Sequence, residues 1–168
     1  HYHSATNMTD QVAALTAISH HTMQEKDDVM AHFENNWIGE PLVMDKWFSI
    51  QALSEASNTF NRVKMLTKHP AFSMKNPNKV RSLIGAYSAN HYHFHENGGS
   101  GYRFLREKII QLDPVNPQIA ARLVTPFTTW KRYDTSRQTL IRNELETIFA
   151  RKILSRDVFE IVNKSLNS

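Results

Sequence analysis

The chain has no cysteine, few glycines and prolines, and no long apolar run. Its 168 residues include 5 Gly and 6 Pro. Without cysteine there is neither a disulfide framework nor a thiolate zinc site. No stretch approaches the ~18 consecutive apolar residues of a membrane span, and the start lacks a basic-then-apolar signal pattern. These absences exclude disulfide-stabilised and membrane-spanning classes and fit a reducing compartment, so we expect a soluble, cytoplasmic domain.

An excess of charge of one sign is also missing. The chain has 20 Lys and Arg against 16 Asp and Glu, and these charges are scattered along the sequence. Nucleic-acid binding needs a basic stripe on one face, so we expect neither a nucleic-acid nor a membrane partner. A chain of this length that is 40% hydrophobic can build one sizeable domain.

What the sequence does contain is an internal repeat. Residues 76–87 and 116–127, offset by 40 residues, align without gaps and both begin with Asn-Pro. Their paired apolar positions fall at i, i+3, i+4 and i+7, which is one stripe along a helix. These pairs are Val80/Ala120, Leu83/Leu123, Ile84/Val124 and Tyr87/Phe127. A helical unit recurring after roughly 40 residues is typical of HEAT and armadillo proteins.

Capping residues and apolar spacing predict helices along the whole chain, with no sustained strand-like alternation. The first expected helix begins after Asn7 or Thr9 and ends at His20-His21, and it is followed by helices over residues 23–35, 41–53 and 54–66, the last capped by Ser54. The next three helices are expected over residues 76–87, 102–112 and 116–127, and Pro126 breaks the third of them. The last two run from Asp134 or Thr135 to Phe149 and from the residue after Ser155 to Leu166. Residues 41–53 are apolar on more than one face and should lie in the middle of their layer. Residues 90–101 are expected to form a loop.

We therefore predict an all-α fold, a right-handed superhelix of antiparallel helix pairs of the HEAT/armadillo type, in a single domain over residues 1–168. Trp47 and Trp130 fall beside leucines and isoleucines, so packing in the core explains them better than base stacking.

Three histidines at alternate positions, His91, His93 and His95, would share one face of an extended segment and could hold zinc or copper. A polar loop is the favoured interpretation, since no carboxylate or cysteine follows at a ligand spacing. His95-Glu96 resembles the start of a zinc-protease helix, but position 99 is Gly instead of the second His. We expect no metal site in this chain.

The glycine-rich segment 98–101 precedes a helix and could present backbone amides to an anion. It lacks the Lys-Ser/Thr ending of a phosphate-binding loop and follows no strand. The favoured interpretation is a flexible turn.

Arg81, Gln118 and Arg122 lie on the two repeated helices. On a concave helical surface their side chains could grip a peptide carboxylate by charge-assisted hydrogen bonds. The alternative is that the arginines are ordinary solvated or salt-bridging residues.

Several sequence blocks together resemble the C-terminal helical domain of the bacterial aminopeptidase N family. The blocks are residues 7–10, 42–48, 76–85, 94–95 with 99–102, 116–118 and 131–134. The likeness runs in order from about Asn7 to Leu166.

The resemblance implies a four-domain zinc metallopeptidase that releases N-terminal residues from short peptides. Its zinc ligands and glutamate base would lie upstream, so this chain alone would bind no zinc and be inactive. The chain would wall the active-site cavity and pack on the upstream catalytic domain, with Arg81, Gln118 and Arg122 binding the peptide beyond the scissile bond. The start at His1-Tyr2-His3, without Met, also suggests a C-terminal piece of a larger protein.

One segment departs from the family pattern. The family commonly has a second Asn-Pro before Phe-His, whereas this chain has residues 90–93 as Asn-His-Tyr-His. Bulky side chains there could narrow an entrance to the cavity. The alternative function is a stand-alone armadillo-like protein-binding module.

Overall fold

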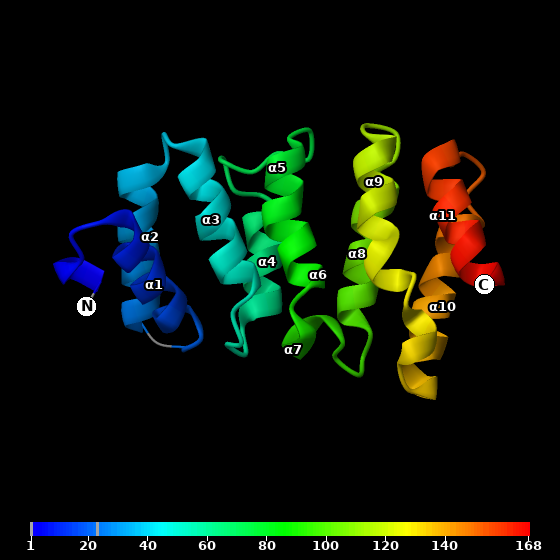
Figure 1. The fold of residues 1–168 in the computed structure, drawn as a ribbon, viewed down its shortest axis with the longest axis horizontal. Coiled ribbons are helices and arrows are strands. Elements are labelled where there is room, and N and C mark those ends of the chain that lie inside the picture. The colour runs from blue at the N-terminus through cyan, green and yellow to red at the C-terminus, as the bar shows by residue number, and fades with distance from the viewer. Residues whose placement is uncertain (1, 23) are drawn as a thin grey trace. The chain divides into compact units, whose positions relative to one another are not determined.

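The computed structural model describes residues 2–22 and 24–168, and every regular element in those ranges is helical (Figure 1). The all-α prediction is confirmed. His1 of the unusual start and Met23 of the second expected helix lie outside the described residues.

Tertiary contacts group the chain into two compact units, residues 1–90 and 91–168. The expected single domain over the whole chain stays a prediction. Across the described ranges, no helix combines the length and apolar character that a membrane span requires.

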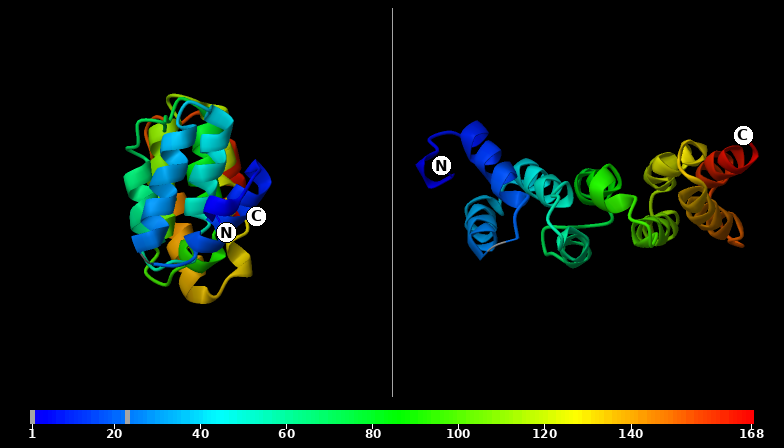
Figure 2. Two further views of the ribbon diagram at one scale, coloured as in Figure 1. Left: turned by 90° about the vertical axis from the view of Figure 1, so that its left-hand side faces the viewer. Right: turned by 90° about the horizontal axis from the view of Figure 1, so that it is seen from below.

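The first unit contains, in chain order, the 3-10 turn η1 (Tyr2–Ser4), α1 (Met8–Ser19), α2 (Gln24–Trp37), α3 (Pro41–Ala52), α4 (Thr59–Leu66), α5 (Pro77–Val80), the π-helical turn η2 (Arg81–Gly85) and α6 (Ala86–Ser88). Figure 2 shows α1 and α2 as an antiparallel hairpin, which fits the antiparallel helix pairs that the sequence predicts.

Two helices of this unit begin at the residues that the sequence predicts, and a third does not. Asn7, one of the two candidate caps, accepts a hydrogen bond from the Asp10 amide at 2.9 Å, and α3 begins with Pro41 in its first turn. The prediction that Ser54 caps the fourth helix is wrong, because α4 begins only after Asn58. The Ser54 hydroxyl is engaged elsewhere, accepting from the Ala56 amide at 3.1 Å and donating to the Ser19 carbonyl.

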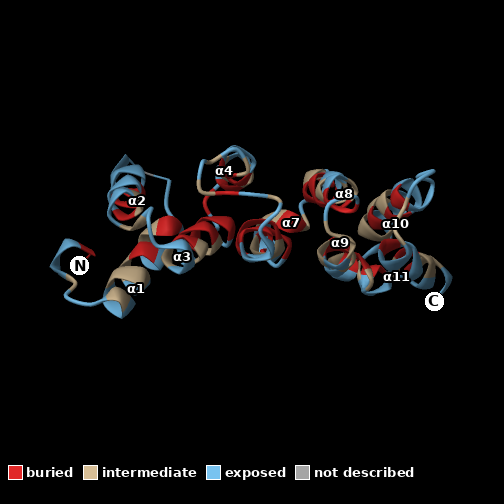
Figure 3. Cartoon of the chain, turned by 90° about the horizontal axis from the view of Figure 1, so that it is seen from above, coloured by how far each residue is buried: buried red, intermediate tan, exposed pale blue. Residues whose placement is uncertain are grey.

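Helix α3 occupies the centre of the first unit, as its apolar character predicts. It packs against α1 and α2, which precede it in the chain, and against α4, α5, η2 and α6, which follow it. Figure 3 shows α1 and α3 in one layer and α2 and α4 in the other, with buried residues between them. The Trp47 side chain is 3% exposed and its indole N–H donates to the Met30 carbonyl at 3.0 Å. The core role expected for Trp47 is confirmed.

The second unit contains α7 (His91–Phe94), α8 (Ser100–Leu112), α9 (Pro117–Val124), the 3-10 turns η3 (Thr125–Phe127) and η4 (Trp130–Arg132), α10 (Thr135–Phe149) and α11 (Arg156–Asn167). Helices α8 and α10 form one layer and α9 and α11 the other (Figure 3). Asp134, one of the two candidate caps, and Ser155 cap α10 and α11 through their side chains. Trp130 is buried and donates to the Ser165 carbonyl at 3.0 Å, which confirms its core role.

Residues 90–101 are not the continuous loop that the sequence suggests, because α7 forms a helical turn within them. The close approach of α7 and α8 requires glycine: an added Cβ on Gly101 would lie 2.5 Å from the Phe94 carbonyl oxygen. Gly99 has a φ of 68°, in the left-handed region that glycine adopts without strain.

The repeat identified in the sequence is a structural repeat of the core. All eight residues of its paired apolar stripe are buried. The helix geometry of the two copies differs, because the first contains the π turn η2 whereas the second continues from α9 into the 3-10 turn η3, where Pro126 lies.

Candidate functional site

Arg81 lies at the start of the π turn and is exposed. Asn76 caps α5 by accepting from the amides of Asn78 and Lys79, and Pro77 occupies the first turn. The Arg81 guanidinium donates to the Asn78 side-chain oxygen at 3.0 Å. Most of its donors therefore remain available to a ligand, because guanidinium carries five N–H groups.

The π turn changes the hydrogen-bonding pattern around Arg81. The Ala86 N–H donates to the Arg81 carbonyl, five residues back, and the Ser82 carbonyl accepts from the Ser49 hydroxyl at 2.9 Å. That second bond joins η2 to α3. Single π turns are frequent at functional sites. No pattern in the sequence predicts this turn.

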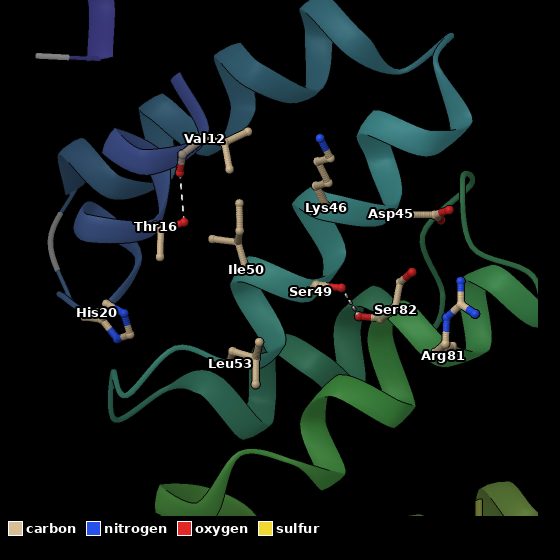
Figure 4. Close-up of a pocket in the computed structure, with 10 residues that line it drawn as sticks. All are labelled: Val12, Thr16, His20, Asp45, Lys46, Ser49, Ile50, Leu53, Arg81 and Ser82. Carbon is tan, nitrogen blue, oxygen red and sulfur yellow. Dashed lines mark hydrogen bonds between the residues drawn. The ribbon is translucent and has the colours of Figure 1, made fainter. Parts of the chain in front are cut away.

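A groove of about 450 Å³ lies beside Arg81 in the first unit (Figure 4). Its wall comes from α1, α3 and η2. Figure 4 shows His20 at one end, Arg81 and Ser82 at the other, and Ile50 and Ser49 between them. The groove brings Arg81 together with Lys46, a cation that the sequence interpretation did not select.

Gln118 and Arg122 lie one turn apart on α9, in the second unit, and both are exposed. Asn116 caps this helix by accepting from the Ile119 amide at 3.2 Å. Among the described residues neither side chain has a hydrogen-bond or ion-pair partner. The structure brings this pair together on one helix, while their convergence with Arg81 stays a prediction.

The histidine cluster is arranged differently from the extended face that the sequence suggests. Since α7 is helical, His91 and His95 stack one turn apart with ring centroids separated by 5.7 Å. His95 Nδ1 lies 2.8 Å from the Tyr102 hydroxyl and Nε2 lies 3.2 Å from the Tyr133 hydroxyl. Within residues 2–22 and 24–168, no group of three His, Cys, Asp or Glu side chains is placed to hold a metal ion.

Burial dominates the electrostatics of this cluster. It lowers the pKa of His95 to about 4, with smaller contributions from the charges of His91 and Arg137. Burial also raises the pKa of Tyr102 to about 12. His95 is therefore a neutral ring held by two phenols, a packing role that the sequence did not reveal.

Arg137 organises the segment that follows α7. Its guanidinium donates to the His95 carbonyl, to the Asn97 side chain and to the Asp134 carboxylate, each at 2.7 Å. The glycine-rich turn next to it is closed by the Glu96 carboxylate, which accepts from the Gly98 amide at 2.8 Å. The favoured interpretation of a turn agrees with this geometry, since the chain's own carboxylate takes the place of an external anion.

Comparison with known proteins gives the relationships of the chain. Residues 1–167 match the family described as "Domain of unknown function (DUF3458_C) ARM repeats". Aminopeptidase N of Haemophilus influenzae is 44% identical over 99% of this chain, and aminopeptidase N of Escherichia coli is 43% identical over 98%. The chain spans 19% of the length of each of these relatives.

A solved structure gives the same picture. The crystal structure of Legionella pneumophila aminopeptidase A in complex with aspartic acid superposes with a TM-score of 0.92 and 35% identity over 96% of this chain and 19% of that one. The predicted resemblance and the HEAT/armadillo-like fold class are confirmed. The chain belongs to the DUF3458_C family of armadillo-type helical repeats.

Proposed function

We propose that this chain is the C-terminal domain of a cytoplasmic zinc aminopeptidase of the aminopeptidase N type, which releases N-terminal residues from short peptides. The observation that carries the proposal is the similarity to aminopeptidase N over 98–99% of the chain. An armadillo-type helical domain is suited to walling a cavity, because its stacked helices present one continuous face.

The described residues of this chain do not suit the zinc, since no three ligand side chains meet among them. The metal and the catalytic carboxylate would belong to an upstream catalytic domain of the same polypeptide. The contribution of this chain would be to exclude water and folded proteins from the cavity and to position the peptide.

Arg81, Gln118 and Arg122 would bind the peptide beyond the scissile bond. All three are exposed, and Arg122 and Gln118 have no partner among the described residues. Arginine binds a carboxylate by paired, charge-assisted hydrogen bonds, which orient as well as attract. The C-terminal carboxylate of a short peptide is the group that fits these donors.

Kinetics of the full-length enzyme test this role. We expect Arg122→Ala to lower kcat/KM about tenfold for a tripeptide with a free C-terminal carboxylate, because one charge-assisted contact is lost. A chromogenic amide without that carboxylate should be hydrolysed at nearly the wild-type rate. Lys152→Ala, which removes an exposed cation elsewhere in the second unit, is the matched control.

Equal losses on both substrates would reject the carboxylate role. Sequencing upstream of His1 provides an independent check of the enzyme class, since a His-Glu-x-x-His helix there is the zinc motif that the proposal requires.

A further inference from the structure

The groove beside Arg81 contains hydrogen-bond donors that can bind a ligand, whereas its hydroxyl and carboxylate groups are already engaged within the chain. The hydroxyls of Thr16, Ser49 and Ser82 are engaged, each donating to a backbone carbonyl at 2.6–2.9 Å. The Asp45 carboxylate, also in the lining, is neutralised by the Lys79 ammonium at 2.7 Å. The negative charge in the lining is thereby balanced by a cation of the chain itself, which lessens its repulsion of an anionic ligand.

Three side chains in the lining remain able to donate. Arg81 uses part of its guanidinium on Asn78, and Lys46 is exposed with no partner among the described residues. His20 Nδ1 accepts from the Glu55 amide at 3.2 Å, so the proton of the neutral ring lies on Nε2. Donors at both ends suit a ligand with a carboxylate at one end and a carbonyl oxygen further along.

The middle of the groove is apolar. Val12, Ile50 and Leu53 lie there, and Leu53 is 45% exposed although it is a large aliphatic residue. Figure 4 shows Leu53 and Ile50 on the α3 side, between the His20 and Arg81 ends. Ile50 is only 8% exposed and forms the floor, so an apolar ligand side chain would gain mainly by removing the surface of Leu53 and Val12 from water.

We infer that this groove is a binding site for the C-terminal residue of a peptide, with its carboxylate at Arg81 and an apolar side chain against Ile50 and Leu53. The inference rests on the proposed function and adds a preference to it: peptides that end in a large aliphatic residue bind better than peptides that end in a small polar one. Lys46 adds positive charge over the bound carboxylate, and His20 meets a peptide carbonyl.

Titration of the 168-residue chain with small peptides, followed by NMR, tests this site directly. Ala-Ala-Leu should shift the signals of Val12, Ile50 and Leu53. Its C-terminal amide and Ala-Ala-Ser should each bind about tenfold more weakly, because the first lacks the carboxylate and the second the apolar side chain. Hexanoate, a carboxylate without peptide groups, should also bind more weakly.

Variants locate the contacts. Arg81→Ala should weaken Ala-Ala-Leu binding about tenfold, and Leu53→Ser should remove the preference for Ala-Ala-Leu over Ala-Ala-Ser. Lys152→Ala, far from this groove in sequence and in the other unit, should change neither. In the full-length enzyme Leu53→Ser should likewise lessen the preference in kcat/KM for peptides that end in Leu.

Equal binding of the amide, or of hexanoate, would overturn the inference, as would shifts confined to residues outside the groove. Binding to this chain needs no catalysis, so the two proposals fail separately. If peptides bind in the groove but the Arg122→Ala enzyme hydrolyses them at the wild-type rate, only the proposed role of Arg122 is rejected. If the Arg122→Ala enzyme loses activity on the tripeptide alone, but peptides do not bind in the groove, only this inference is rejected.

Discussion

The Lys79 ammonium lies 2.7 Å from the Asp45 carboxylate and joins α5 to α3 in the first unit. The two side chains are only 7% and 16% exposed. Lys79 also donates to the Pro41 carbonyl at 2.8 Å, so the ammonium satisfies the first turn of α3 as well as its acidic partner. Removing only one partner of a pair this buried is costly, because the charge of the other partner is left buried and unpaired.

Asp45→Asn should therefore lower the free energy of unfolding by roughly 3 kcal/mol, because it leaves the Lys79 charge without a carboxylate. Urea denaturation of the chain measures this. The double variant Lys79→Met with Asp45→Leu should recover most of the loss, since it buries no charge. Glu160→Gln breaks the exposed pair with Arg156, whose side chains are 88% and 60% exposed, and should change stability by less than about 0.5 kcal/mol.

Gly101→Ala should destabilise the second unit by about 2 kcal/mol or more, because the new methyl group would collide with the Phe94 carbonyl oxygen. Thermal denaturation reports the change. Gly39→Ala is the matched control: no atom lies within 4 Å of its added Cβ, and the expected effect is neutral or slightly stabilising. Equal effects at the two glycines would show that the approach of α7 to α8 is not tight.

The His95 ring should make stability depend on pH in acid. Its pKa is about 4 in the folded chain, below the ordinary value of 6.5 that applies after unfolding. Between these values the unfolded chain binds a proton that the folded chain does not, so folding stability falls as pH drops from 6.5 to 4 and levels off below that.

His95→Gln should flatten this part of the pH profile in urea denaturation between pH 7 and 4.5. The groups facing the ring, namely His91, Arg137, Tyr102 and Tyr133, remain in the variant, so the difference isolates His95. His21→Gln, which replaces an exposed histidine, should leave the profile unchanged. An imidazole signal of His95 that titrates near pH 6.5 would contradict the prediction.

The two Asn-Pro caps should contribute equally to the stability of their helices. Asn76→Ala and Asn116→Ala each remove a side-chain acceptor from a first turn, at an expected cost of about 1 kcal/mol. Asp at either position should retain most of the stability. Asn35→Ala, at an exposed position in the last turn of α2, should be neutral or mildly stabilising because alanine favours helix.

Local signals in the sequence predicted most of the helices, because caps and apolar spacing act over a single turn. Asn7, Asp134 and Ser155 cap the helices expected of them. The error at Ser54 has a tertiary cause: its hydroxyl bonds to the Ser19 carbonyl, a partner 35 residues away that no local pattern reveals.

The candidate site was predictable only in part, for the same reason. The resemblance to the aminopeptidase N family, more than the repeat itself, pointed to Arg81, Gln118 and Arg122, which the structure places at exposed positions. The groove beside Arg81 depends on α1 and α3, so His20 and Lys46 carry no signal of their own in the sequence. The burial that lowers the pKa of His95 arises from packing against Tyr102 and Tyr133, which the spacing of the histidines does not encode.

The two copies of the repeat keep the same interior with helical turns of opposite kind, one widened at Arg81–Gly85 and one tightened at Thr125–Phe127. In the first copy Leu83 and Ile84 belong to the widened turn and are both fully buried, so the core of this repeat accommodates the change of helix geometry. A widened turn also changes the angular position of the residues that follow it, compared with a regular α-helix.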